Sequence, residues 1–239
     1  MGLGAVLFDI DDTLFSTTQF AKVARRNAVR AMIANGLDLS EEVVLRELEE
    51  VLAEFTSNYD QHYDQLLKRL RPKCLERVNP ALLVAAGVAA YHDTKFRELK
   101  PFDDVLPLLE ALRKAGLVVG IVTHGWTIKQ AEKIVRLGVV PYLSPRAVFI
   151  SDQLGIAKPN PKIYALALRD LGLAPADAMY VGDSPSHDIT PPKSLGMKAV
   201  WARRASRHHP SVGDAIPDHV VDSFVELRTI LREQYGLAV

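Results

Sequence analysis

The sequence predicts an α/β fold in which a parallel sheet forms the core and an all-helical segment is inserted after the first strand. Short apolar runs without polar alternation, typical of strands covered on both faces, recur at residues 6–10 and between residues 118 and 223. Amphipathic helical patterns separate the later runs, which indicates strand–helix–strand units. By contrast, residues 17–96 show helical patterns and no convincing strand.

The expected strands are short and rich in β-branched residues. The first reads VLFDI, and the second reads VVGIVT. A weaker run, DHVVDS, would add a last strand. The expected strands cover residues 6–10, 118–123, 147–151, 178–183, 198–203 and 218–223.

Helices are expected between these strands because parallel strands need crossover connections. The segment VLPLLEALRKAGL places apolar residues at helical spacing and contains a glycine near its end that can cap a helix. Two later segments repeat that arrangement. The expected crossover helices cover residues 105–117, 127–139 and 161–173.

The helical segment is expected to form a second lobe of its own. Leu48, Leu52 and Phe55, for example, share one face of a helix. An all-helical block of nearly 80 residues inserted after the first strand is best interpreted as a second lobe. The predicted α/β core therefore comprises residues 1–16 and 97–239, and the predicted helical lobe comprises residues 17–96.

Composition narrows the class of protein. The 239 residues include 29 Lys and Arg against 29 Asp and Glu, which argues against a nucleic-acid or anionic-membrane partner. Cys74 is the only cysteine, so an internal disulfide and two-cysteine metal motifs are excluded. No apolar run approaches the ~18 residues of a membrane span, and acids follow the first residues too soon for a signal peptide. A cytoplasmic protein is expected.

Polar residues that could carry chemistry fall at the ends of the expected strands. Asp9 and Asp11 close the first strand, Thr123 ends the second, and Asp183 ends the fourth. Lys158 lies in the loop after the third strand. Ligands of open parallel sheets bind beyond the carboxyl ends of the strands, so these side chains should converge. Converging carboxylates need a neutralising partner, and the oxygen-liganded cation Mg²⁺ is the expected one.

These residues stand in four motifs that resemble those of the haloacid dehalogenase-like superfamily. FDIDDTL at residues 8–14 is similar to the first motif, DxDxT, and IVT at residues 121–123 to the second. AKPNP at residues 157–161 resembles the third, KPxP, and VGDSPSHD at residues 181–188 the fourth, GDxxxxD. The resemblance covers essentially the whole chain. It implies a Rossmann-like core with the helical C1 cap of subfamily I, in the phosphatase-like branch.

The resemblance implies Mg²⁺-dependent hydrolysis of small-molecule phosphate monoesters. Asp9 would be the nucleophile that forms an aspartyl-phosphate, and Asp11 would first donate and then accept a proton. The donor role requires a pKa raised above the usual value of about 4. The carboxylates of Asp9 and Asp183 and the backbone carbonyl of Asp11 would hold Mg²⁺. Thr123 and Lys158 would bind phosphoryl oxygens and stabilise their charge.

Five further residues follow from the resemblance or depart from it. Asp188 would orient either a metal-bound water or Lys158. His124 stands where the family commonly has Asn after the second motif, and Gly125 matches the Gly that usually follows it. This change is either neutral or brings His124 into contact with the substrate, with Gly125 beside it at the phosphate. Pro191 and Pro192 depart from the family pattern after Asp188, and they predict a helix that begins near Pro191.

Three alternative functions stay open from the sequence. A 2-haloacid dehalogenase needs one nucleophilic Asp but neither the second acid nor a metal, so Asp11 and Asp183 argue against it. A phosphomutase shares the acids of the first motif and is harder to separate. A non-enzymatic binding or regulatory member would usually have lost the nucleophile or a metal-binding aspartate, and this sequence keeps both.

Other polar residues receive structural interpretations. Asp12 is expected to bond to backbone in the loop after the first strand, and Thr13 to form a local hydrogen bond. His208 and His209, within RRASRHHP, are expected in a solvated basic loop, because the sequence places no carboxylate or thiol at ligand spacing. Cys74 is expected to be a small apolar filler.

Overall fold

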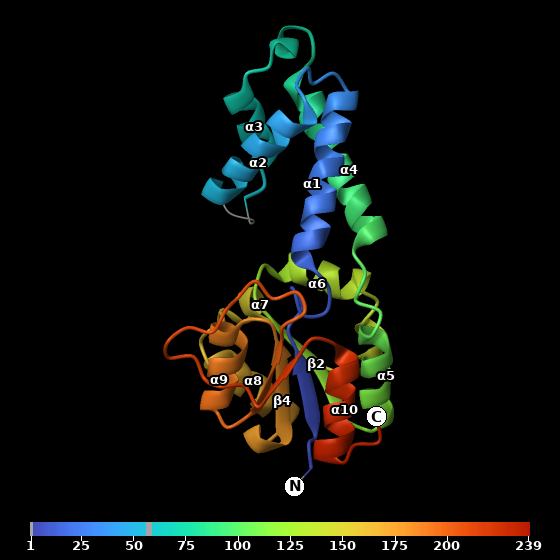
Figure 1. The fold of residues 1–239 in the computed structure, drawn as a ribbon, viewed down its shortest axis with the longest axis vertical. Helices are drawn as coiled ribbons and strands as arrows, with labels where there is room; N and C mark the ends of the chain where they lie inside the picture. The colour runs from blue at the N-terminus through green and yellow to red at the C-terminus, as the bar shows by residue number, and fades with distance from the viewer. Residues whose placement is uncertain (1, 56–58) are drawn as a thin grey trace. The chain divides into compact units, whose positions relative to one another are not determined.

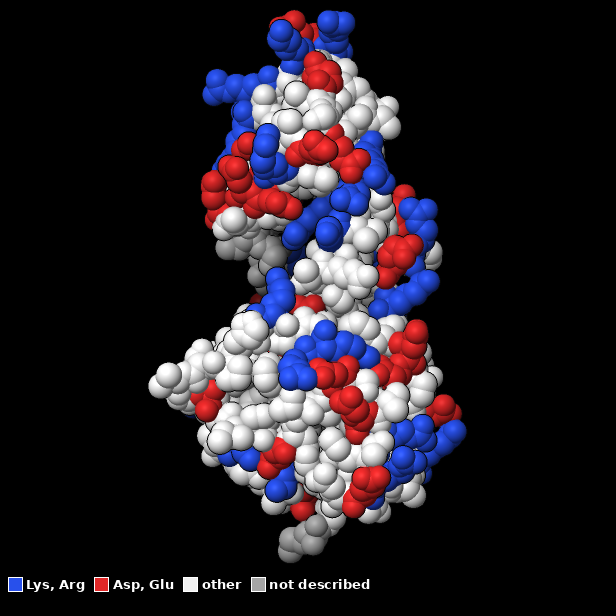
Figure 2. Space-filling view, in the orientation of Figure 1, with Lys and Arg blue, Asp and Glu red and all other residues white. Residues whose placement is uncertain are grey.

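The computed structural model describes residues 2–55 and 59–239. The chain divides into two compact units (Figure 1). The α/β unit comprises Met1–Thr17 and Lys100–Val239, and the helical unit comprises Thr18–Leu99. On the face drawn in Figure 2, basic and acidic side chains are interspersed over both units, in keeping with their equal numbers in the sequence.

Six parallel strands form the sheet of the α/β unit, in the order β3-β2-β1-β4-β5-β6. The predicted α/β fold with a helical insertion after the first strand is confirmed, and each of the six expected strands is present. β1 lies between β2 and β4, so strands far apart in the sequence are direct neighbours. The strands are β1 (Ala5–Phe8), β2 (Val118–Thr123), β3 (Val148–Ile150), β4 (Ala178–Gly182), β5 (Lys198–Ala202) and β6 (His219–Val221).

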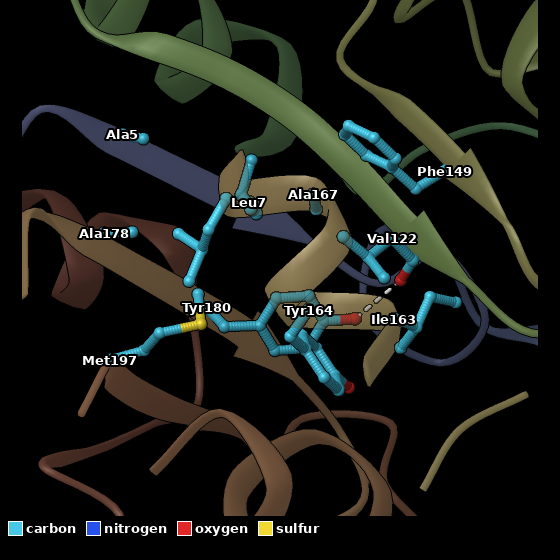
Figure 3. Close-up of a cluster of buried hydrophobic side chains, with 11 residues drawn as sticks. Ala5, Leu7, Val122, Phe149, Ile163, Tyr164, Ala167, Ala178, Tyr180 and Met197 are labelled. Carbon is cyan, nitrogen blue, oxygen red and sulfur yellow. Dashed lines mark hydrogen bonds between the residues drawn. The ribbon is translucent and has the colours of Figure 1, made fainter. Parts of the chain in front are cut away.

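One face of the sheet packs against α8 (Lys162–Leu171) in a buried apolar cluster (Figure 3). Tyr164 of α8 and Tyr180 of β4 meet edge to face, with ring centroids 4.8 Å apart. The Tyr180 hydroxyl donates a hydrogen bond of 2.6 Å to the backbone oxygen of Val122 on β2. This hydroxyl is therefore a polar group inside an apolar core, and its acceptor Val122 lies one residue before the end of β2.

The other face of the sheet packs against α5 (Val105–Lys114) and α10 (Phe224–Tyr235), which contact each other. Successive strand residues point to opposite faces, so Phe8 faces away from the Leu7 side. The Phe8 and Phe224 ring centroids are 5.6 Å apart. With helices on both faces, the strands are buried on both sides, which is why their sequences lack polar alternation.

The remaining helices of the α/β unit follow the strands. α5, α6 and α8 end a few residues before their predicted ends, close to glycines. After β4, a π-helical turn leads directly into α9. The start of α9, within one residue of Pro191, agrees with the prediction, whereas the π turn was not predicted. These elements are α6 (Thr127–Arg136), α7 (Ser151–Leu154), the π turn Pro185–Ile189 and α9 (Thr190–Ser194).

In the described residues of the helical unit, four α-helices surround their own apolar cluster. Cys74 is buried in that cluster, which confirms its predicted role as an apolar filler. Within residues 2–55 and 59–239, no helix combines the length and apolar character that crossing a bilayer requires. The helices are α1 (Thr17–Ala34), α2 (Glu41–Phe55), α3 (His62–Leu70) and α4 (Pro80–Glu98).

Candidate active site

The carboxyl ends of three adjacent strands bring the predicted polar residues together. Asp9 follows β1, Thr123 ends β2 and Asp183 follows β4. The Asp9 amide donates to the Val181 carbonyl at 2.9 Å, which continues the pairing of β1 with β4 beyond the last strand residue. Lys158 enters from the loop between α7 and α8. The parallel topology is thus what turns separate strand ends into one site.

Lys158 is buried at the centre of this site, with 3% of its side chain exposed. Its ammonium donates to Asp9 Oδ1 at 2.6 Å, to Asp188 Oδ1 at 2.8 Å and to the Tyr180 hydroxyl at 3.0 Å. An ammonium has three protons, so these bonds use all of them. The neighbouring carboxylates Asp188 and Asp9 hold the pKa of Lys158 well above its usual range against the opposing effect of burial.

Asp188 is fixed from two sides within the π turn. Its Oδ1 accepts from Lys158, and its Oδ2 accepts from the Ser184 amide at 3.0 Å. Gly182 makes room for it: a Cβ at this position would lie 2.4 Å from Asp188 Cβ and Cγ. Of the two orientation roles predicted for Asp188, the structure contains the contact with Lys158.

Asp9, Asp183 and Asp188 form a buried carboxylate cluster whose ligand atoms lie within 4.8 Å of one another. Burial raises the pKa of Asp9 to about 7, although Lys158 opposes the shift. Burial and the negative charge of Asp9 raise the pKa of Asp183 to about 8. The single positive charge of Lys158 therefore does not neutralise the three carboxylates of the cluster. An oxygen-rich, negatively charged pocket of this kind suits a hard divalent cation.

The Asp11 carboxylate does not belong to the cluster of Asp9, Asp183 and Asp188 and has its own hydrogen-bond partners. Lys133 Nζ lies 2.7 Å from each of its carboxylate oxygens, Gln130 Nε2 donates to Oδ2 at 3.0 Å, and the Thr17 hydroxyl donates to Oδ1 at 2.8 Å. Burial alone would raise the pKa of Asp11, but Lys133 and the hydrogen bonds outweigh it and lower the pKa. The raised pKa that the proton-donor role requires is therefore absent in this arrangement, whose contacts favour the ionised carboxylate.

Lys133 and Gln130 were not predicted to belong to the site. Both lie on α6, three residues apart and therefore on neighbouring positions of one face. Gln130 is only 4% exposed, and its amide also donates to the His124 carbonyl. The signal available in the sequence was the spacing of Gln130 from Ile134, four residues on, because a long polar side chain on an apolar helix face needs a partner.

The loop after β2 holds the predicted phosphate contacts. The Thr123 hydroxyl is buried and finds no hydrogen-bond partner among the described residues. His124 is exposed, and the Gly125 amide donates to the Ser151 hydroxyl at 2.9 Å. A buried hydroxyl without a partner is costly, so Thr123 fits a site completed by a ligand oxygen.

Asp12 and Thr13 differ in outcome. Asp12 adopts a positive φ of 54°, and its Oδ1 accepts from the Thr17 amide at 2.8 Å. The prediction that Asp12 bonds to backbone is confirmed. The prediction of a local hydrogen bond from the Thr13 side chain is wrong, because its buried hydroxyl has no partner in the described part of the chain.

The basic loop after β5 returns to the site. His208 Nε2 lies 3.8 Å from Asp183 Oδ2, and Arg207 Nε lies 3.5 Å from Asp12 Oδ2. The Ser206 hydroxyl donates to the Asp183 carbonyl at 2.6 Å. Arg207, His208 and His209 are nevertheless exposed, which confirms the predicted solvated basic loop. The contacts of this loop with Asp12 and Asp183 were not predicted.

Comparison with known proteins agrees with this architecture. Residues 3–196 match the family described as haloacid dehalogenase-like hydrolase. A glyceraldehyde 3-phosphate phosphatase of Methanopyrus kandleri is 46% identical over 237 residues, covering 96% of this chain and 97% of the relative. A protein of the same name from Pyrococcus furiosus is 39% identical over 232 residues, covering 97% of this chain and 94% of the relative.

A solved structure extends the agreement to the fold. The crystal structure of a HAD phosphatase from Thermococcus onnurineus is similar with a TM-score of 0.63 at 27% identity, covering 96% of this chain and 98% of that one. The family and the phosphatase activity predicted from the four motifs are confirmed by these relatives.

Proposed function

The chain belongs to the haloacid dehalogenase-like hydrolases, and we propose that within this family it is a Mg²⁺-dependent phosphatase of a phosphorylated three-carbon sugar, glyceraldehyde 3-phosphate or a close analogue. The observation that carries the proposal is the buried cluster of Asp9, Asp183 and Asp188 around Lys158, together with a Thr123 hydroxyl that has no partner among the described residues. The two glyceraldehyde 3-phosphate phosphatases, which align with 96% and 97% of this chain, support the choice of substrate.

The carboxylate cluster fits Mg²⁺. Asp9 and Asp183 would supply carboxylate oxygens, and Asp11 would supply its backbone carbonyl. Asp188 already accepts from Lys158 and from the Ser184 amide, so it is better suited to holding Lys158 than to binding the metal. When bound, Mg²⁺ would neutralise the excess negative charge of the cluster and of the substrate phosphate.

Asp9 is the proposed nucleophile. Its Oδ would form a bond to phosphorus while the bond from phosphorus to the substrate oxygen breaks, giving an aspartyl-phosphate. Lys158 fixes the Asp9 carboxylate through its 2.6 Å contact. To donate to a phosphoryl oxygen it would give up one of its three present hydrogen bonds, and Thr123 would donate to the phosphoryl group beside it. His124 and Gly125 follow Thr123 directly and are proposed to border the phosphate, with the Gly125 amide engaged by Ser151.

Asp11 is the proposed proton shuttle. Because its contacts favour the ionised form, Asp11 would first take up a proton from solvent and give it to the departing alkoxide. It would then take a proton from the water that attacks the aspartyl-phosphate, which restores the protonated form for the next cycle. The contact with Lys133 favours the ionised carboxylate, which is the form required for the second half of the reaction.

The proposal is tested by measuring phosphate release from a panel of sugar, nucleotide and two- or three-carbon phosphates, with Mg²⁺ and with EDTA. We expect metal-dependent turnover that is fastest with triose phosphates. Asp9→Asn should abolish turnover, whereas Asp103→Asn, an exposed aspartate of the same unit, should leave it unchanged. Turnover without metal, an active Asp9→Asn variant, or chloride release from a 2-haloacid would contradict the proposal.

A further inference from the structure

Two side chains of α6, Lys133 and Gln130, grip the Asp11 carboxylate. Lys133 Nζ contacts both oxygens at 2.7 Å, and Gln130 Nε2 contacts Oδ2 at 3.0 Å. We propose that Lys133 and Gln130 are positioning residues that hold Asp11 at the leaving oxygen of the substrate. This inference rests on the proton-transfer role proposed for Asp11.

The contacts restrict how Asp11 can turn. Lys133 and the Thr17 hydroxyl engage Oδ1, while Lys133 and Gln130 engage Oδ2. Because both oxygens are held, rotation of the carboxylate breaks at least one hydrogen bond. Proton transfer requires donor and acceptor within about 2.6–3.2 Å. A carboxylate already fixed in orientation reaches this geometry at a lower entropic cost.

The helix that carries the two residues is itself anchored. At its start, the Thr127 amide and hydroxyl donate to Asp152 Oδ2 at 2.9 and 2.7 Å. Gln130 is buried against the loop after β2, where a Cβ on Gly125 would lie 2.6 Å from its Nε2. Positioning side chains act best from rigid elements, and this first turn of α6 is fixed on both sides.

A purely structural role predicts a different outcome. If Lys133 only tied α6 to the loop after β1, its loss would reduce stability and affect all substrates alike. A positioning role affects the step in which the leaving group takes a proton. Lys129, one turn earlier on α6, lies over the Trp126 ring at 4.3 Å and provides a matched control.

The test compares two phosphomonoesters that differ in their need for a proton. The p-nitrophenolate group leaves readily without one, whereas the alkoxide of an alkyl phosphate does not. The parameter kcat/KM covers the steps up to this departure and excludes hydrolysis of the aspartyl-phosphate. We expect Lys133→Met to lower kcat/KM for the alkyl phosphate by roughly 10- to 100-fold, and for p-nitrophenyl phosphate by less than about threefold. Lys133→Arg should regain most of the loss, and Lys129→Met should resemble the parent.

Two results would overturn the inference: equal losses with both substrates, or full alkyl phosphatase activity in Lys133→Met. The crystal structure of Lys133→Met is a second test, which does not depend on measuring enzyme activity. Asp11 should turn away from its present direction while Asp9 and Lys158 keep their contact; an unmoved Asp11 overturns the inference. Failure of the proposed function would instead be seen in the parent protein, as absence of phosphate release.

Discussion

Two lysine–aspartate pairs lie at the candidate site, and they have opposite effects on the two aspartates. Lys158 lies 2.6 Å from Asp9, and Lys133 lies 2.7 Å from Asp11. The pKa of Asp9 is nevertheless raised to about 7, whereas the pKa of Asp11 is lowered. Contact with an ammonium therefore does not by itself decide the charge of a carboxylate.

The difference lies in how many carboxylates share each ammonium. Lys158 is divided between Asp9 and Asp188 and is buried, whereas Lys133 serves Asp11 together with two neutral donors. The Lys158 side of the site lacks positive charge, which a cation can supply. The Lys133 side is balanced without one. The following variants test this contrast, beginning with the largest expected effect.

Removing the ammonium from the unbalanced side should cost the most. Lys158→Met leaves Asp9 and Asp188 buried without their shared partner, and we expect unfolding in urea near neutral pH to show a loss of about 3–5 kcal/mol. Lys114→Met, which breaks the exposed pair with Glu110, should change the free energy of unfolding very little. Equal losses in both variants would contradict the contrast.

The metal-free protein should become less stable as pH rises. Because the pKa values of Asp9 and Asp183 are raised to about 7 and about 8, the folded state keeps protons that the unfolded chain has already released. Their contribution is complete below the ordinary carboxyl pKa and is lost as pH rises through the folded values. Thermal unfolding in EDTA across this range measures the effect.

Added Mg²⁺ should reverse that loss, because it competes with protons for the same oxygens. At a concentration 100 times its Kd, the ion would stabilise the protein by about 2.7 kcal/mol. We expect its effect on the melting temperature to be larger above the raised pKa values than below them, and to shrink in Asp183→Asn. A Mg²⁺ effect independent of pH would exclude these carboxylates as its ligands.

Gly182→Ala should disturb the unbalanced side through packing. The added Cβ would lie 2.4 Å from the Asp188 side chain, and we expect overpacking to cost about 1–3 kcal/mol in a urea titration. Gly4→Ala is the matched control, because its nearest neighbour would lie 3.7 Å from the Cβ. If Gly182→Ala were as stable as Gly4→Ala, Asp188 would not be held as described.

The smallest change is expected from Gln130→Met on the balanced side. It removes one hydrogen bond from Asp11 and one from the His124 carbonyl, for about 1 kcal/mol of stability. The lowered pKa of Asp11 stabilises the folded protein above the ordinary carboxyl pKa, and this contribution is lost as the pH falls through the folded value. Part of the stability difference between the parent and Gln130→Met should therefore vanish at low pH. Gln153→Met, at an exposed glutamine, should show no such pH dependence in the same denaturation series.

The positions of Asp9, Thr123 and Asp183 could be predicted because each ends a strand. Parallel strands carry their carboxyl ends to one edge, so the predicted strands already imply that these residues meet. The contact of Lys158 with Asp188 was one of two predicted options, since a loop lysine has several partners within reach.

Lys133, Gln130 and His208 could not be placed in the same way. Helical spacing predicts which residues of α6 share a face, but it does not distinguish a polar side chain that faces the loop after β1 from one that faces water. His208 reaches Asp183 because the loop after β5 folds back, and that path depends on tertiary packing rather than on local pattern.

The position of β1 in the centre of the sheet has a consequence for how the chain folds. β1 is synthesised first, yet its two neighbours begin only at Val118 and Ala178. The contacts within residues 18–99 are more local, so the helical unit can form while β1 is still unpaired. A chain that stops short of β4 would leave an apolar strand edge open to other molecules. Chaperone dependence and aggregation during synthesis should therefore be governed by the late pairing of β4 with β1.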